Sequence, residues 1–251
     1  MGATREPSWV LFDVLLPLLA IAAYIFYYRA LGAPSAFEGF VVLGGAMTAF
    51  WLNVLWGMAA QFFWEKEVGN LQLFLVSPMS RMALLAGMAL GGMFFSTVRA
   101  MSTLILGLII FQVQVTVTDP VALAAVFAIT MVAIYGMGMM FSSVFLMYGR
   151  DAWNLSNLMQ EPIYLVSGFY FPVRALGFWV SAAASAIPIT LGLDAMRQIL
   201  FGPAAEGWLP VSTEIALLII LAVVFITLAK LSLDYMERLG RREGRLTLRW
   251  Q

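Results

Sequence analysis

Long apolar runs separated by short polar segments constrain the fold of this 251-residue chain more than any other feature. An α-helix rises about 1.5 Å per residue, so about 20 apolar residues cross a hydrocarbon core of about 30 Å. Windows of this length predict six spans, at residues 9–31, 39–63, 82–112, 120–148, 152–168 and 212–233. With 62% hydrophobic and 11% charged residues, the composition excludes an ordinary soluble domain. We expect an all-α membrane protein that forms a single transmembrane domain over residues 1–251.

The segments between the spans are short, with two exceptions. Residues 64–81 follow the second span as a polar island, and the spacing of its apolar residues predicts a short amphipathic helix. Residues 169–201 contain Pro172 and Pro188 within apolar sequence, which predicts a re-entrant hairpin because each piece is too short to cross. The first apolar run follows no small-residue cleavage site, so we expect it to be retained as a span. The arginine-rich residues 234–251 predict a tail at the anionic inner membrane surface.

Lysine and arginine are distributed unevenly among the polar segments, and this distribution predicts the orientation. Arg99 lies inside a predicted span and is left out of the count. If the N-terminus is cytoplasmic, the external cations are Arg29, Arg174 and Arg197. The internal cations are then Arg5, Lys66, Arg81, Arg150, Lys230, Arg238, Arg241, Arg242, Arg245 and Arg249. The bias predicts a multi-pass protein of the inner or plasma membrane, with both termini and the segment 64–81 in the cytoplasm and the hairpin 169–201 outside.

The residue types present exclude most catalytic chemistry. The sequence has no Cys and no His, which removes thiol nucleophiles, imidazole bases and the usual zinc sites. A serine protease built on Ser167 would therefore lack its histidine base, and the scattered acidic residues do not suggest a metal-dependent phosphotransferase. No Gly-x-x-x-x-Gly-Lys-Ser/Thr motif is present to hold nucleotide phosphates. We expect a protein that is not an enzyme and has no metal or cofactor of its own.

Three ionisable residues fall within the predicted spans, where charges are costly and face protein or water. Arg99 and Glu161 both fall in the middle part of their spans, so we predict an intramembrane ion pair between them. This pair is either a structural bridge between the third and fifth spans or a part of gating and substrate passage. Asp13 lies near the cytoplasmic end of the first span and is interpreted as an interfacial hydrogen-bonding residue.

Amide and aromatic side chains gather on the second and fifth predicted spans. Such side chains either form hydrogen bonds between helices or line a path through the membrane, and the sequence leaves both interpretations open. The candidate path-lining residues are Trp51, Asn53 and Trp56 on the second span, Asn154, Asn157, Gln160, Glu161 and Tyr164 on the fifth, and Phe171 just beyond it.

Two motifs resemble those of the type-2 ABC export permeases. The first is EKEVGNL at residues 65–71, followed by LVSPMSR at residues 75–81, directly after the second span. The second lies after the fifth span and consists of SGFYFP from residue 167, IPIT from residue 187 and DAMR from residue 194. Together with six spans in the same order, these motifs make the resemblance cover nearly the whole chain.

The resemblance implies a half-transporter. Two copies of this chain, or this chain and a related permease, would form the path, and each would dock on a separate ATP-binding-cassette subunit that holds ATP and Mg. The segment 64–81 would be the coupling helix, while the second and fifth spans would line the dimer axis beneath the hairpin 169–201. The matching candidates for contact with the ATPase are Glu65, Lys66, Glu67, Gly69, Leu71, Pro78 and Arg81.

The expected function is therefore ATP-driven export of an amphipathic, drug-like or lipid-like compound. A path that is largely apolar and carries amide and aromatic groups suits such a cargo better than it suits a small ion. One alternative is export of a polysaccharide or a lipid-linked glycan. A second alternative is a stand-alone secondary transporter or channel, which would need inverted repeats or several embedded ionisable groups. The expected partners are the ATP-binding subunit, a second permease copy and the lipid bilayer, and no nucleic acid.

Overall fold

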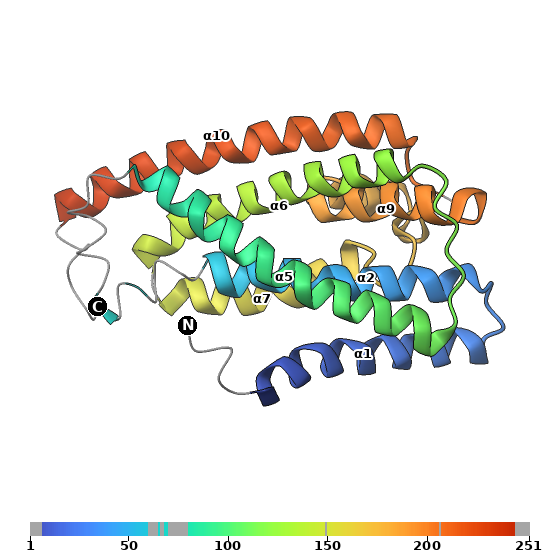
Figure 1. The fold of residues 1–251 in the computed structure, drawn as a ribbon. Coiled ribbons are helices and arrows are strands. Elements are labelled where there is room, and N and C mark those ends of the chain that lie inside the picture. Colours follow the sequence, from blue (N-terminus) through green and yellow to red (C-terminus); the bar gives the residue numbers. More distant parts are fainter. Residues whose placement is uncertain are drawn as a thin grey trace.

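The computed structural model describes residues 7–59, 65, 68–69, 80–148, 150–205 and 207–243. These residues form eight α-helices, most of which run along one axis (Figure 1), and they contain no strand. The helices are α1 (Pro7–Ala30), α2 (Ala36–Leu52), α5 (Arg81–Phe111), α6 (Pro120–Tyr148), α7 (Arg150–Val166), α8 (Phe178–Ala184), α9 (Pro188–Phe201) and α10 (Val211–Glu243). A π-helical turn, η1 (Asn53–Ala59), continues α2, and two 3-10 turns are η2 (Val173–Leu176) and η3 (Gly202–Ala205). The expected all-α class is confirmed for the described part of the chain.

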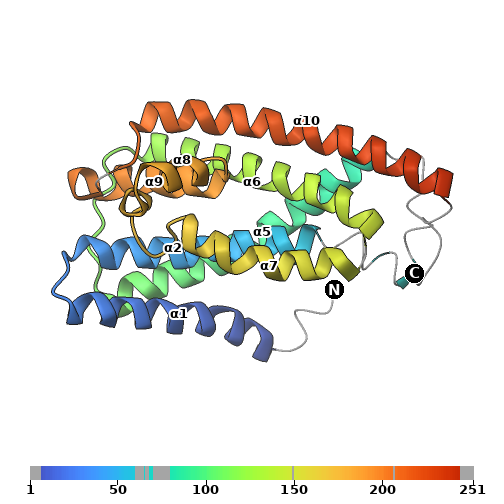
Figure 2. The ribbon, with the colours of Figure 1, turned by 180° about the vertical axis from the view of Figure 1, so that it is seen from behind.

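The bundle has two distinct ends (Figures 1 and 2). We call one the hairpin end, because it carries the α1–α2 loop, the α5–α6 loop and the α8–α9 pair. We call the other the junction end, because α6 passes into α7 there and α10 finishes there. The orientation predicted from the sequence would place the hairpin end outside and the junction end in the cytoplasm.

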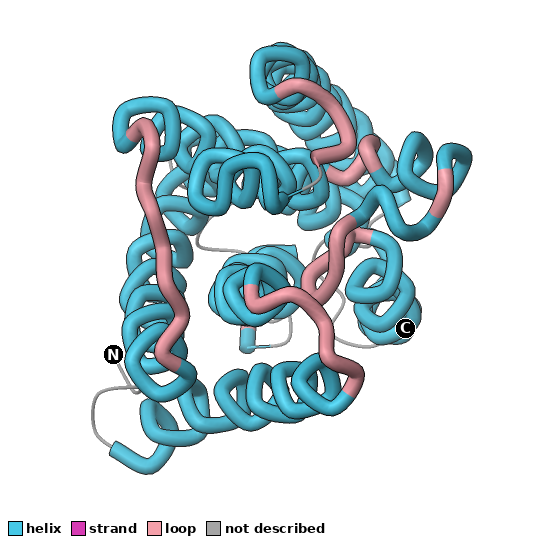
Figure 3. The backbone as a smooth tube through the Cα atoms, turned by 90° about the vertical axis from the view of Figure 1, so that its right-hand side faces the viewer, coloured by secondary structure: helices cyan, strands magenta, loops and turns pink. Residues whose placement is uncertain are grey.

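Helix α2 lies in the centre of the bundle, and the other helices surround it (Figure 3). Every residue from Gly39 to Trp51 is buried. The sequence of this stretch is apolar on all sides of the helix, which is the pattern of a helix enclosed by neighbours. By contrast, only 17% of the most apolar window of α10 is buried, as expected for a helix that faces lipid.

Two adjacent glycines allow other elements to approach α2 closely. A β-carbon on Gly44 would overlap the carbonyl oxygen of Phe169, and one on Gly45 would overlap the side chain of Ile21 in α1. Small residues at helix contacts are the usual means of close packing in membrane proteins. The Gly44–Gly45 pair therefore determines how near α1 and the turn after α7 lie to the centre.

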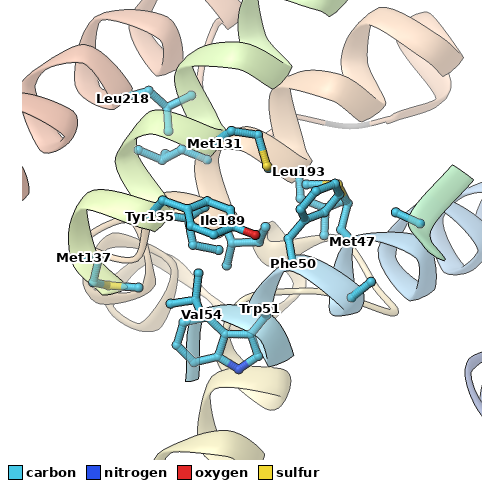
Figure 4. Close-up of a cluster of buried hydrophobic side chains, with 14 of the residues drawn as sticks. Met47, Phe50, Trp51, Val54, Met131, Tyr135, Met137, Ile189, Leu193 and Leu218 are labelled. Carbon is cyan, nitrogen blue, oxygen red and sulfur yellow. The ribbon is translucent and has the colours of Figure 1, made fainter. Parts of the chain in front are cut away.

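The main hydrophobic core lies between α2, α6, α9 and α10 (Figure 4). Phe50 and Trp51 of α2 and Tyr135 of α6 belong to this core, while Leu193 comes from α9 and Leu218 from α10. These large side chains are almost completely buried, so burial of each aliphatic one contributes about 1.5–3 kcal/mol. The core connects α2 to the C-terminal half of the chain.

Local capping interactions explain where α5 and α6 begin. The Ser80 hydroxyl accepts a hydrogen bond from the Ala83 amide at 3.2 Å, which satisfies a free donor in the first turn of α5. Asp119 does the same for α6, accepting from the amides of Val121 and Ala122 at 3.0 and 2.9 Å. Pro120 occupies the first position of α6, where its missing amide hydrogen costs nothing.

Four helical segments are long and apolar enough to cross a membrane, and the α8–α9 pair makes a fifth if it is counted as one bent span. The four are Ala36–Ala59, Arg81–Phe111, Pro120–Ser143 and Val211–Met236. All six predicted spans are helical where they are described, but α7 is short and rich in polar residues, and the apolar part of α1 covers only Val14–Ala30. The multi-pass architecture is confirmed with four to five candidate spans.

The predicted re-entrant hairpin occupies the segment that holds α8 and α9. These helices are bent by 109° relative to each other. Pro188 stands at the first turn of α9, and Ile187 before it has the extended backbone that proline imposes on its predecessor. The bend therefore follows from the Ile187–Pro188 dipeptide noted in the sequence.

Candidate functional site

Helix α7 presents a polar face to its surroundings. Asn154, Asn157 and Glu161 are three and four residues apart, so they share one face of the helix, and all three are exposed. Ser156 and Ile163, on the opposite face, are buried. A row of amides and a carboxylate facing lipid would be costly, so this face is suited to water or to another protein chain.

The junction of α7 with η1 lies beside this polar face. The indole of Trp56 donates a hydrogen bond to the Gln160 side chain at 2.8 Å, and the Gln160 amide donates to Glu161 at 3.2 Å. Tyr135 of α6 donates to the Asn53 side chain at 3.0 Å. These contacts place Gln160 beside the last turns of the central span, so interhelical bonding accounts for part of the polar cluster seen in the sequence.

The remaining candidate path residues occupy different environments. Trp51 is completely buried in the main core, so within one chain it packs and does not line an open path. Tyr164 is half-buried, with its ring 5.2 Å from that of Phe169. Phe171 is half-buried in the turn after α7.

Arg99 and Glu161 lie on different helices. Arg99 is half-buried on α5, whereas Glu161 is exposed on α7. The Glu161 carboxylate accepts a hydrogen bond from the Gln160 amide. The ion pair between Arg99 and Glu161 stays a prediction. Asp13, the third ionisable residue, falls within α1.

The π-helical turn η1 is a feature that the sequence does not indicate. It extends α2 by seven residues, Asn53–Ala59, and residues 60–63 separate it from the predicted coupling segment. Turns of this type are rare and are frequent at functional sites. Asn53 and Trp56, both candidate path residues, belong to it.

Arg197 is a buried residue whose importance the sequence did not reveal. Its guanidinium donates to the carbonyls of Gly168 and Phe171 at 2.7 and 3.1 Å, and to those of Phe169 and Phe40 at 2.8 and 3.0 Å. It is 1% exposed and lies over the Phe40 ring. The sequence counted Arg197 among the cations of the outer segment 169–201, but its charge is not in contact with solvent, because four backbone carbonyls hold it inside the protein.

A second buried polar cluster lies next to Arg197. The Gln198 amide donates to Asp194 at 3.1 Å, to the Leu209 carbonyl at 2.8 Å and to Glu214 at 3.1 Å. The Trp208 amide also donates to Asp194, at 2.7 Å. Asp194 is 2% exposed and Glu214 is completely buried. This cluster joins the end of α9 to the start of α10.

The predicted coupling segment, residues 64–81, is described at five positions, namely 65, 68, 69, 80 and 81. Glu65 is in a helical turn, Gly69 has a left-handed backbone with φ of 86°, and Ser80 and Arg81 begin α5. Of the predicted ATPase contacts, Lys66, Glu67, Leu71 and Pro78 lie outside the described residues. The glycine at 69 fits this position, because a side chain would be strained there.

Comparison with known protein families decides the assignment. Residues 2–201 match the family model described as ABC-2 type transporter. The chain belongs to the ABC-2 type transporter family. It is thus a membrane permease subunit of such a transporter, and membership implies pairing with a separate ATP-binding subunit. A comparison with curated proteins finds no match.

The match extends through α9 and stops before α10. It therefore includes both motifs that suggested the resemblance, as well as the polar face of α7 and Arg197. Because ATP is bound by the partner subunit in this family, the permease contributes a path and a docking surface. The polar face of α7 is therefore considered below as part of a path or of a docking surface, and not as a catalytic site.

Proposed function

We propose that this ABC-2 permease is an exporter subunit that moves an amphipathic, drug-like or lipid-like compound along a path lined by α7 and by the end of α2. The observation that carries this proposal is the exposed polar face formed by Asn154, Asn157 and Glu161. It runs along a helix that packs beside the central span and includes both amides and a carboxylate. Such a surface can bind the polar part of an amphipathic cargo, while the apolar residues of the same helix contact its apolar part.

A second copy of the chain, or a related permease, is proposed to complete the path. A charged side chain at the centre of a membrane helix costs about 2.5–3.5 kcal/mol on insertion scales, so Glu161 favours a site away from lipid. Leu158 and Leu165 flank the polar residues and are 70% and 62% exposed. This mixture of exposed leucines and amides fits an interface between chains that also encloses water.

The proposed topology has six spans with both termini in the cytoplasm. α1 and α7 complete the six, since each is helical and lies along the bundle (Figure 2). Of the cations assigned to the outside, Arg197 is buried and Arg29 is paired with Glu38 at 2.7 Å. Fewer uncompensated positive charges therefore lie on the proposed outer side than the count of arginines in the sequence suggests, which supports the proposed orientation. Trp179 of α8, 83% exposed, fits an aromatic anchor at the outer interface.

The segment 64–81 is proposed as the coupling helix. It follows η1 at the junction end, and Ser80 and Arg81 at its close begin α5. A push on this segment by the ATP-binding subunit would therefore act on α2 and α5 together. Movement of α2 would change its contact with α7 through Trp56 and Gln160.

The proposal is tested by expressing the chain together with candidate ATP-binding-cassette proteins. We expect one of them to co-purify in mild detergent and the reconstituted complex to move a fluorescent amphipathic dye across the vesicle membrane only with hydrolysable ATP. The chain alone serves as the control. Transport by the chain alone, with no ATPase retained, would refute the proposal.

A further inference from the structure

A polar cleft and an apolar cavity lie side by side at the hairpin end. The cleft has a volume of about 590 Å³, and its walls include Glu38, Gln114 and Thr116. The cavity has a volume of about 430 Å³ and is enclosed by α2, α5, α6 and α9. Leu200 and Phe201 line both spaces, so the two are neighbours.

The loop at residues 113–118, which follows the left-handed Gln112, separates the two spaces. Its sequence, VQVTVT, alternates apolar and polar residues. Gln114, Thr116 and Thr118 accordingly line the polar cleft, whereas Val115 and Val117 line the apolar cavity. The Thr118 hydroxyl donates to the Ile199 carbonyl at 2.7 Å, which attaches this partition to α9.

The cavity offers its occupant no free polar group. Thr97 is the polar side chain in its wall, and its hydroxyl donates to the Met93 carbonyl one helical turn earlier, at 2.8 Å. A cavity of this kind does not bind water, because water needs several polar partners. Its volume lies within the range of about 300–1,000 Å³ found for small-molecule sites.

The cavity communicates with the surface that faces lipid. Met101 of α5 and Ala124 of α6 line it and are exposed. Around Met101, α5 exposes a continuous apolar surface that includes Val98 and Ile105, which are 55% and 49% exposed. Hydrocarbon chains of the bilayer therefore lie at the opening of the cavity.

We infer that these two spaces form one binding site for a resident glycerophospholipid. One acyl chain occupies the apolar cavity between α5 and α6, and the head group lies in the polar cleft beyond residues 113–118. The Glu38 carboxylate in the cleft wall accepts two hydrogen bonds from Arg29, so the amide of Gln114 and the hydroxyl of Thr116 supply the hydrogen-bonding groups for the head group. Both side chains carry acceptor oxygens, which suits a head group that donates hydrogen bonds, such as ethanolamine. The site is distinct from the polar face of α7. The inference depends on the membrane assignment and not on the transport function.

Native mass spectrometry of the chain, extracted from nanodiscs that contain phosphatidylethanolamine and phosphatidylcholine, tests this site. We expect the unmodified chain to retain one phosphatidylethanolamine under conditions that remove annular lipid. Ala124→Phe should abolish retention by filling the cavity. The matched control is Ala125→Phe, on the same helix and also exposed but outside the cavity wall, which should retain the lipid.

A second variant tests the head-group part without filling the cavity. Thr116→Val removes one hydroxyl from the cleft at constant shape and should reduce the preference for phosphatidylethanolamine over phosphatidylcholine by about fivefold, the value of one hydrogen bond. Both variants are compared by thermal melting, so that a folding defect is recognised. Equal lipid retention by A124F and A125F would overturn the inference, as would a chain that retains detergent or no lipid at all.

Discussion

Helices α7 and α9 both carry polar residues within an apolar protein, but they use them in opposite ways. In α9, Asp194 and Arg197 are 2% and 1% exposed and bind partners within the same chain. In α7, Asn154, Asn157 and Glu161 are exposed. A buried polar group that is fully bonded fixes a fold, whereas an exposed one in a membrane helix requires a surrounding that is not lipid. This difference supports a structural role for α9 and the proposed transport role for α7.

The position of each helix fits this division. Arg197 bonds to the carbonyls of Gly168, Phe169 and Phe171 in the turn after α7 and to one carbonyl of α2, so α9 fixes the hairpin end on the central helix. Helix α7 contacts the central span through Trp56 and Gln160 and leaves its other face open. One end of the molecule is therefore held rigidly, while the side of α7 is available for partners or cargo.

The largest effect is expected from removing the buried guanidinium. Arg197→Leu leaves four carbonyls in the interior without their donor and should destabilise the fold by about 3–5 kcal/mol, comparable to breaking a buried charged pair. Thermal unfolding in detergent and the yield of monodisperse protein measure this. Arg174→Leu is the control, because Arg174 is exposed in η2. If the R197L protein were as stable as the R174L protein, the buried Arg197 would not stabilise the fold, and the structural role of α9 would be refuted.

A smaller loss is expected where the same turn meets α2. Gly44→Ala places a β-carbon against the carbonyl oxygen of Phe169, which is backbone and cannot rotate away, so the cost should be about 1–3 kcal/mol. Gly87→Ala on α5 is the control, since no atom lies near its β-carbon position, and it should be neutral or stabilising by up to about 1 kcal/mol. Thermal unfolding of both variants checks the pair. Equal stability of G44A and G87A would show that the close contact is not real.

On α7 we expect the opposite pattern, with loss of activity at constant stability. Asn157→Leu should change stability by less than about 0.5 kcal/mol, because the site is exposed. ATP-dependent dye transport should fall about tenfold, the equivalent of one lost hydrogen bond of about 1.4 kcal/mol. Thr227→Leu, at an exposed position of α10, should affect neither property. If N157L transports normally, the polar face of α7 does not line the path.

The smallest effect is expected at the coupling segment. Glu65→Lys should lower stimulation of the partner's ATPase activity by up to about fivefold, because exposed ion pairs contribute about 0.2–1 kcal/mol. Asp234→Lys, an exposed charge reversal near the end of α10, is the control and should leave stimulation intact. Co-purification of the two subunits is measured at high and low salt, since screening should mimic the variant. An E65K permease that stimulates ATPase activity fully would exclude Glu65 from the contact.

Much of the fold was predictable because its signals are local. The apolar runs predicted helices that match the described ones to within a few residues at most boundaries, and Asp119 and Pro120 marked the start of α6. Residues 187–188 marked the bend between α8 and α9. Each of these features depends on neighbours in the sequence, so one sequence is enough to read it.

The contacts of the candidate site were less predictable because they join distant residues. Arg197 bonds to the carbonyl of Phe40, 157 positions away, and nothing in the residue types near Arg197 indicates this. The π-helical turn η1 likewise has no local marker. The polar residues of α7 were identified from the sequence, but which of them bond internally and which are exposed depends on packing.

The most direct test of a path lined by α7 is to measure what surrounds residue 157 in the membrane. The chain contains no cysteine, so Asn157→Cys and Thr227→Cys each introduce the single thiol of the protein. Thiol-specific cross-linkers of graded length are applied to membranes from cells that express either variant. We predict that N157C forms a cross-linked dimer while T227C, on the lipid-facing α10, stays monomeric. A monomeric N157C at every cross-linker length, with both thiols equally shielded from water-soluble maleimide, would contradict a path lined by α7.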